Sequence, residues 1–322
     1  MEGFRCYPIL EAQVQITATQ IANWAGTPEA RSALPRLIRR LIHTAGIPTY
    51  ADFPAGASVD LPGWDGHLRV DKHVSPWIPT GESFWEFSCE KQETRKANRS
   101  YAGRTEEAPD TVRLNATLII VSARPWSQRK RWLEDKVARG EWSQVRAYNA
   151  NDLEQWLEQS PAAQLQFAEE LGLSGPGVQS VKSHWEDWSQ QVEPTISAEA
   201  LFKDRENIRE RLITDIHRRL DAHQSAPLTL KADSVDEAVA FVCAALLADP
   251  ILDATSLVVT QSDGWRFVEQ NANLKVAVAA RPEIAAAPVR RQGLVVIVPY
   301  AAGDMEGGDR NADLVLERPR IY

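Results

Sequence analysis

The chain has 322 residues, of which 43% are hydrophobic and 25% charged, and its formal net charge is −8. This composition is typical of a globular protein with at least one substantial core, and it excludes a disordered or fibrous chain. The acidic balance argues against a protein whose whole surface binds nucleic acid. A local basic patch can still bind nucleic acid, because charges elsewhere on the surface are screened over only about 8–10 Å.

The sequence shows no membrane or export signal. No apolar run approaches the roughly 18 residues that a membrane span needs, and the N-terminal residues lack the charged and apolar regions of a signal peptide. Three cysteines, Cys6, Cys89 and Cys243, are odd in number and far apart, which favours reduced thiols. We therefore expect a cytoplasmic protein with no membrane partner.

Tryptophan usage divides the chain, because ten of the eleven tryptophans lie at or before Trp188. A Gly-, Ser- and Pro-rich stretch at 171–180 marks the expected boundary. We predict a first domain over 1–173, a linker over 174–194 and a second domain over 195–322. The chain stops soon after a predicted strand, so we expect it to be one part of a longer protein.

In the first half, apolar residues at helical spacing predict a helix over 30–46, with Gly46 as its C-terminal stop. Two short strands, 67–71 and 84–88, are joined by a turn-rich hairpin. The elements expected after them are a helix at 92–104, a strand at 116–123, a helix at 129–140, a strand at 144–149 and one or two helices at 150–172. This alternation predicts an α/β layer structure.

The second half begins with a predicted helix over 197–223. The following elements are a strand at 227–233, a helix at 234–248, a strand at 256–261, a short helix at 263–272 and strands at 275–280 and 293–300. A succession of apolar strands and helices of this kind is typical of a parallel sheet covered by helices.

Two carboxylates stand out in the first half. Asp65 lies in the Gly-flanked bend "PGWDG", and Glu86 lies in the strand "FWEFS", where alternation places Phe84, Glu86 and Ser88 on one face. A hairpin of this length can bring Asp65 beside Glu86. Converging carboxylates are the hard oxygen ligands that Mg²⁺ or Mn²⁺ prefers, and a metal bound there would activate water for attack on a phosphate.

A basic helix follows this strand. Its cations are Lys91, Arg95, Lys96, Arg99 and Arg104. A nearby lysine can orient the nucleophile or offset developing negative charge, and arginines can contact the phosphate backbone without reading sequence. The alternative interpretation is an ordinary solvated helix face.

These motifs, together with "KAN.SY..RT" from Lys96 and "RPW" from Arg124, resemble the PD-(D/E)XK restriction-endonuclease-like superfamily. The closer resemblance is to Mrr-like or Cap-type nuclease effectors at the N-terminus of bacterial anti-phage proteins, and it covers about 15–173. It implies a central mixed sheet flanked by helices, with Asp65 and Glu86 as metal ligands. In this superfamily an acidic residue from the first helical region often serves as a third metal ligand, and Glu29 matches that role loosely.

The chain departs from the superfamily at one position. A lysine is usual two residues after the second carboxylate, and this chain has Ser88 there. Lys91 or Lys96 must then substitute, and the sequence does not decide between them.

The start of the second half, "ALFKDRENIRERLITDI", resembles the entry box of STAND-type and AAA+ NTPases, which implies a P-loop-NTPase-like α/β domain. No G-x-x-x-x-G-K-[ST] motif follows, and "KADSVDEA" offers no glycine to cradle phosphate. Ser234 followed by Glu237 indicates a capping box. We expect a degenerate domain that does not bind ATP.

The sequence thus predicts a metal-dependent DNA endonuclease effector of bacterial anti-phage defence with little sequence specificity. Its partners would be DNA and either further copies of itself or other domains or subunits of a defence system. The alternative is a catalytically inactive nuclease-like scaffold that binds DNA or mediates oligomerisation, and Ser88 favours it.

Overall fold

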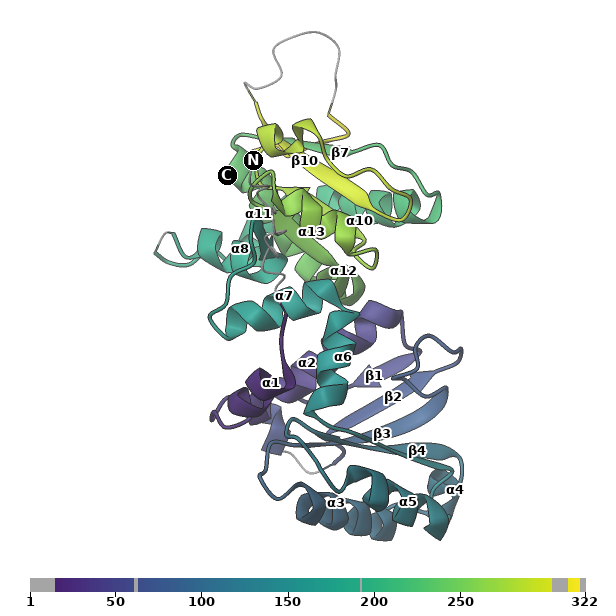
Figure 1. The fold of residues 1–322 in the computed structure, drawn as a ribbon. Coiled ribbons are helices and arrows are strands. Elements are labelled where there is room, and N and C mark those ends of the chain that lie inside the picture. Colours follow the sequence, from purple (N-terminus) through teal and green to yellow (C-terminus); the bar gives the residue numbers. More distant parts are fainter. Residues whose placement is uncertain (1–14, 61–62, 192, 303–311, 319–322) are drawn as a thin grey trace, which may run out of the picture. The chain divides into compact units, whose positions relative to one another are not determined.

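The computed structural model describes residues 15–60, 63–191, 193–302 and 312–318. It divides into two compact units. The first unit contains Ile16–Ala163 and Asp249–Thr255, and the second contains the other described residues. Each unit has helices flanking one mixed sheet, of five strands in the first unit and six in the second (Figure 1). The predicted α/β class is therefore confirmed.

The first sheet has the strand order β1-β2-β3-β4-β5. Its strands are β1 (Tyr50–Asp52), β2 (Gly66–Val70), β3 (Gly81–Ser88), β4 (Ala116–Ser122) and β5 (Gln144–Tyr148). Strands β1, β2 and β3 pair antiparallel, whereas β3, β4 and β5 pair parallel. The predicted hairpin is thus the pair β2–β3, and β3 is the strand that joins the antiparallel part of the sheet to the parallel part.

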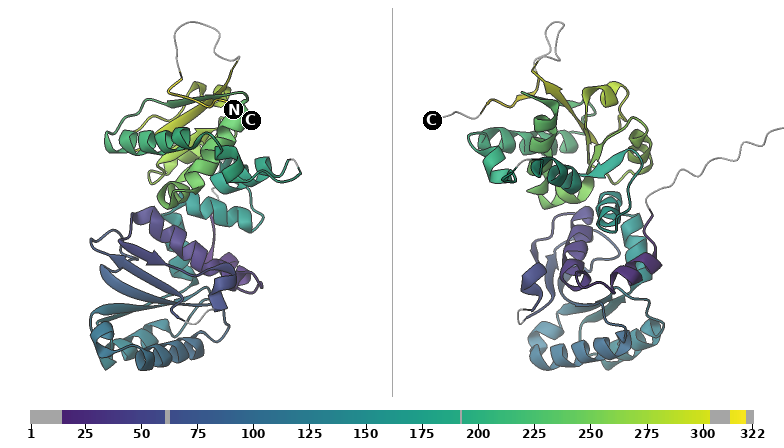
Figure 2. Two further views of the ribbon diagram at one scale, coloured as in Figure 1. Left: turned by 180° about the vertical axis from the view of Figure 1, so that it is seen from behind. Right: turned by 90° about the vertical axis from the view of Figure 1, so that its left-hand side faces the viewer.

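Helices cover both faces of this sheet. On one side lie α1 (Ala18–Trp24), α2 (Ala30–Ala45) and α6 (Ala150–Glu158), and on the other lie α3 (Glu93–Glu107) and α5 (Arg129–Arg139) (Figures 1 and 2). Two short elements, η1 (Gly56–Asp60) and α4 (Asp110–Arg113), complete the unit. Helix α2 ends at Gly46, as predicted, with a positive φ of 151° that glycine adopts more readily than other residues.

Side chains alternate along β3 between two environments. Phe84 lies in a buried cluster with Trp132 of α5, whereas Trp85 packs edge-on against Phe53. Residues two apart in a strand share a face, so Glu86 lies on the same side as Phe84. The predicted alternation is confirmed, and it places Glu86 on the side of α3.

Helix α3 is attached to its neighbours largely through tryptophans. Its buried residues are only Ala97, Ser100 and Tyr101. Three indole N–H groups donate to its side chains at 2.8–3.0 Å: Trp126 to Thr94, Trp132 to Asn98 and Trp142 to Thr105. These acceptors lie three to four residues apart or at multiples of that spacing, so they form one stripe of the helix. An indole buries a large apolar body but its N–H needs a partner, and α3 supplies those partners.

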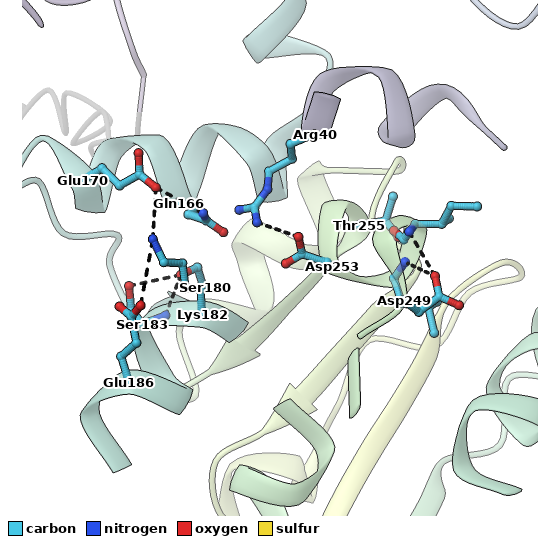
Figure 3. A network of polar contacts seen from close by, with 12 residues as sticks. Arg40, Gln166, Glu170, Ser180, Lys182, Ser183, Glu186, Asp249, Asp253 and Thr255 are labelled. Atoms are coloured by element: carbon cyan, nitrogen blue, oxygen red, sulfur yellow. Dashed lines mark hydrogen bonds and ion pairs between the residues drawn. The ribbon is translucent and has the colours of Figure 1, made fainter. Parts of the chain in front are cut away.

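One helix of the first unit comes from late in the chain. Helix α12 (Pro250–Thr255) packs against α2, and Arg40 of α2 donates to Asp253 at 2.5 Å (Figure 3). Asp249 accepts hydrogen bonds from two backbone N–H groups of the first turn and so caps α12. Neither this helix nor its pairing with α2 was predicted, because Arg40 and Asp253 are 213 positions apart.

The second sheet has the order β11-β7-β10-β9-β8-β6. Its strands are β6 (Val178–Ser180), β7 (Leu228–Ala232), β8 (Ser256–Val259), β9 (Val276–Ala279), β10 (Val295–Ala301) and β11 (Leu314–Val315). The four predicted strands, β7 to β10, pair in parallel as expected. Strand β6 pairs antiparallel with β8 at one edge, so the sheet is mixed and the purely parallel prediction is wrong there.

Helix α7 (Pro161–Glu170) begins in the last residues of the first unit and continues in the second. The other helices of the second unit are α8 (Val181–Ser189), α9 (Ala198–Phe202), α10 (Glu206–Asp221), α11 (Val235–Leu247), α13 (Gly264–Gln270) and η2 (Pro282–Ala286). The single helix predicted over 197–223 is in fact two, because Asp204 adopts a left-handed φ of 61° between them. Lys182 of α8 pairs with Glu170 of α7 and Glu186 of α8 (Figure 3). No helix in the described ranges is long and apolar enough to cross a membrane.

We predict that Gly66→Ala destabilises the first unit. A Cβ at Gly66 would lie 2.4 Å from the ring of Phe53, which is buried, so the ring and β2 must shift. We expect a loss of about 1–3 kcal/mol of unfolding free energy, measured by chemical denaturation. Gly103→Ala is the matched control: its Cβ meets no atom within 4 Å, and in helix α3 it should stabilise by about 0.5–1 kcal/mol. An equal effect of the two substitutions would contradict this packing.

Candidate functional site

Asp65 lies in the bend that leads into β2. Its Oδ2 accepts a hydrogen bond of 2.7 Å from the backbone N–H of Phe87 in β3. Next to it, the Trp64 ring lies against Phe84, with ring centroids 4.5 Å apart. The bend is therefore held against β3 by the side chains of Trp64 and Asp65, and the predicted approach of Asp65 to the Glu86 strand is confirmed.

Glu86 is a buried carboxylate near the end of β3. The residue is only 4% exposed, and its Oε1 accepts a hydrogen bond of 2.5 Å from Nε of Arg104 on α3. The pair is buried on both sides, with side-chain exposures of 5% for Glu86 and 18% for Arg104. Breaking a buried ion pair leaves an uncompensated charge, which costs about 3–5 kcal/mol.

Arg104 connects every part of this site. Besides Glu86, it donates to the backbone carbonyl of Gly63 and to Glu107. Its guanidinium carbon lies 4.7 Å from the centroid of the Trp64 ring, a cation–π contact. A planar guanidinium with five N–H donors can make these contacts at once. Arg104 therefore ties the bend that carries Asp65 to the strand that carries Glu86.

The electrostatics of the site raise the pKa of the Glu86 carboxyl. Burial raises the pKa of its carboxyl above the ordinary value of 4.5, and the negative charge of Asp65 raises it further. The positive charges of Arg104 and Lys96 act in the opposite direction and lower the pKa, but they do not cancel the rise. The site therefore gathers two carboxylates and two cations, and a further cation would favour the ionised form of Glu86.

The structure distinguishes the two candidate lysines. Lys96 is partly buried, acts on the charge of Glu86 and donates to Ser100 Oγ at 3.1 Å. Lys91 is exposed, and it is not among the charges that act on Glu86. Lys96, Ser100 and Arg104 are spaced four residues apart, so they form one stripe of α3 that faces the β3 carboxylate.

Four other candidate residues have simpler roles. The Ser88 hydroxyl accepts the backbone N–H of Glu90, and Arg99 forms an exposed ion pair with Glu90 at 2.7 Å. Arg95 is exposed on α3. Glu29 is exposed at the start of α2 and does not act on the charge of Glu86. Arg95 and Arg99 therefore face solvent, whereas Arg104, which was predicted to contact nucleic acid, is occupied within the protein.

Each carboxylate of the site accepts a hydrogen bond from the protein through one of its two oxygens. Among the described residues, no hydrogen-bond donor contacts Asp65 Oδ1 or Glu86 Oε2. Within the same part of the chain, no group of three or more His, Cys, Asp or Glu side chains is placed to hold a metal ion. Mg²⁺ is usually bound by one or two carboxylates, with water and substrate phosphate as its other ligands. The chemistry of this donor pair therefore fits Mg²⁺ or Mn²⁺.

In the second unit, protein groups surround the turn between β7 and α11, where a phosphate-binding loop would lie. Ser234 accepts the N–H of Glu237 and caps α11. The reciprocal bond of a capping box is replaced by an ion pair of 2.9 Å between Glu237 and the buried Arg205. Arg205 also donates to the carbonyl of Glu317, and Arg318 pairs with Asp233.

The role of Arg104 was not predicted, although the sequence carries a signal for it. Lys96, Ser100 and Arg104 repeat at intervals of four residues, which places them together on any helix. The sequence does not show whether that stripe faces the sheet or the solvent. The indole hydrogen bonds to the other stripe of α3 decide this orientation.

We predict that the Glu86 carboxyl titrates above pH 4.5. Because folding raises the pKa of this carboxyl, Glu86 contributes stability below its unfolded pKa, and this contribution is lost as the pH rises through the folded pKa. The measurement is a ¹³C NMR titration of side-chain carboxyls, with Glu86 identified as the signal missing from Glu86→Gln. Asp65→Asn should lower the midpoint and Arg104→Gln should raise it. A wild-type midpoint at or below 4.5 would contradict the burial of this charge.

Comparisons with other proteins add no further constraint. No protein-family model, curated protein or solved structure matches this chain.

Proposed function

We propose that the first unit is a restriction-endonuclease-like domain that hydrolyses phosphodiester bonds with Mg²⁺ or Mn²⁺. The observation that carries the proposal is the buried Glu86 carboxylate, 4% exposed, placed beside Asp65 and within the field of Lys96. Burying a carboxylate next to a second one is costly unless a cation compensates it. Such an arrangement is what a metal-dependent phosphodiesterase needs.

Each residue has a defined role in the proposed reaction. Asp65 and Glu86 would hold the metal ion, which when bound would supply an activated water and offset charge on the phosphate. Lys96 orients the attacking water or neutralises the developing negative charge. Arg104 acts as a positioning residue, because it holds the Glu86 side chain and the Asp65 bend at the same time. Lys96 thus takes the role of the lysine that is usual in the superfamily at the position of Ser88.

The proposed substrate is DNA, as the family resemblance implies. Arg95 and Arg99 are exposed on α3 and can contact the phosphate backbone, which provides affinity without sequence readout. The wider assignment, a cytoplasmic effector of bacterial anti-phage defence that works as an oligomer or with further subunits, depends on the family resemblance. The second unit would be a degenerate NTPase-like domain that does not bind ATP, because acidic residues and the Arg205–Glu237 pair surround the turn.

One observation favours a second candidate function, a catalytically inactive scaffold. The Arg104 guanidinium already compensates Glu86, and Ser88 occupies the usual lysine position. In that case, the ion pair is a structural replacement for a metal, and the nuclease-like unit binds DNA or mediates oligomerisation.

We predict metal-dependent cleavage of supercoiled plasmid that requires the site residues. With Mg²⁺ or Mn²⁺, the rate for Asp65→Asn, Glu86→Gln and Lys96→Gln should fall by at least about 100-fold, because each loses charge stabilisation of the transition state. Lys91→Gln should retain activity. The rate is measured from the conversion of supercoiled to nicked and linear DNA on gels.

Controls separate the two candidate functions. Lys72→Gln, a substitution of an exposed lysine in the β2–β3 connection, should cleave like the wild type. Equal cleavage by wild type and Glu86→Gln would assign the activity elsewhere. DNA binding by the wild type without cleavage, under every metal tested, would establish the scaffold instead.

A further inference from the structure

A groove lies between α3 and α5, on a different side of α3 from Glu86. Its volume is about 780 Å³, which is within the range of small-molecule sites. The lining residues that matter here are Asn98, Tyr101, Gln128, Arg131, Trp132 and Lys136. The residues facing Glu86 are on the Lys96–Ser100–Arg104 stripe, so the groove is separate from the proposed nuclease site.

The two amide side chains that line the groove, Asn98 and Gln128, accept hydrogen bonds through their oxygens. An indole N–H can only donate, so the bond of 3.0 Å from Trp132 requires Asn98 to offer its oxygen. The Gln128 oxygen accepts from the hydroxyl of Thr94. No described acceptor uses the NH₂ groups of Asn98 and Gln128, so both remain available as donors at the groove.

Lys136 adds a buried cation to the groove. The residue is 6% exposed, and its Nζ lies 5.1 Å from the ring centroid of Tyr101 and 5.8 Å from that of Trp132. Its ion partner is the exposed Asp135, whose Oδ2 lies 3.0 Å from Nζ and also accepts from Arg139. An ammonium group has three N–H donors, and in the described part of the chain Asp135 Oδ2 is the only hydrogen-bond acceptor of the Lys136 ammonium. A buried charge with unused donors requires a further acceptor.

The acidic residues that line the groove make no described contact with Lys136 beyond its pair with Asp135. Asp135 already serves two cations, and Glu141 accepts from the Tyr101 hydroxyl at 2.7 Å. Glu106, the remaining acidic residue, is exposed on the rim. Arg131 is also exposed and has no ion-pair partner among the described residues. The groove is thus lined by three cations and three carboxylates, and Lys136 and Arg131 keep N–H donors that no described acidic side chain uses, which suits a ligand rich in acceptors.

We propose that the groove between α3 and α5 binds a phosphate group, with Lys136 and Arg131 as its cations and the amides of Asn98 and Gln128 as neutral donors. The phosphate can belong to a free nucleotide or to a nucleic-acid backbone, since both present the same acceptors. This site does not depend on cleavage at Glu86.

The test is calorimetric titration of the full chain with three probes, inorganic pyrophosphate, ATP and a short single-stranded oligonucleotide. EDTA in the buffer removes any metal from the Glu86 site. Lys136→Met keeps the apolar stem between the rings and removes the charge, and Arg131→Gln removes the exposed cation. Each should weaken binding by about tenfold, the usual cost of one charge-assisted hydrogen bond. Lys130→Gln is the matched control, because Lys130 is exposed on α5 beside Arg131 but does not line the groove.

The outcomes separate the ligand sources and the two sites. Binding of ATP or pyrophosphate alone supports a free nucleotide. Tighter binding of the oligonucleotide, with a salt dependence that weakens by about one phosphate contact in Arg131→Gln, supports a nucleic-acid backbone. Binding that is unchanged in Arg131→Gln, or no binding of any probe by the wild type, would overturn the proposal. Glu86→Gln should bind like the wild type, so loss of nuclease activity and loss of phosphate binding are distinguishable.

Discussion

The buried ion pair between Glu86 and Arg104 is the constraint on which the first unit's site depends. A carboxylate at 4% exposure is stable only with a compensating charge, and Arg104 supplies it at 2.5 Å. Because the same guanidinium reaches the Gly63 carbonyl and the Trp64 ring, it also sets the position of the bend that carries Asp65. The separation of the two carboxylates therefore depends on a helix that follows both of them in the chain.

Helix α3 can position Arg104 because its opposite stripe is anchored. The acceptors Thr94, Asn98 and Thr105 bind three indole N–H groups, and these bonds orient a helix that has few buried apolar residues of its own. One stripe thus serves the β3 carboxylate, and the other forms a wall of the groove beside α5. Trp126, Trp132 and Trp142 suit this role, since each indole contributes apolar area and one directed donor.

The fold was largely predictable where the signal is local. The amphipathic spacing of α2, the alternation in β3 and the apolar runs of β7 to β10 all produced elements at the expected places. The failures were non-local or single-residue effects. Helix α12 and its pairing with α2 join distant parts of the chain, β6 is a three-residue edge strand, and the break between α9 and α10 depends on the backbone of Asp204 alone.

For the site, the sequence by itself indicated that the bend with Asp65 adjoins the strand with Glu86 and that a basic helix follows, because strand alternation and hairpin length are local properties. It left open which lysine faces the carboxylate, and it counted Arg104 among the surface cations. Only the tertiary structure decided these points. The direction in which a helix presents its stripes is set by what packs against it, and for α3 that packing comes from tryptophans that follow it in the chain.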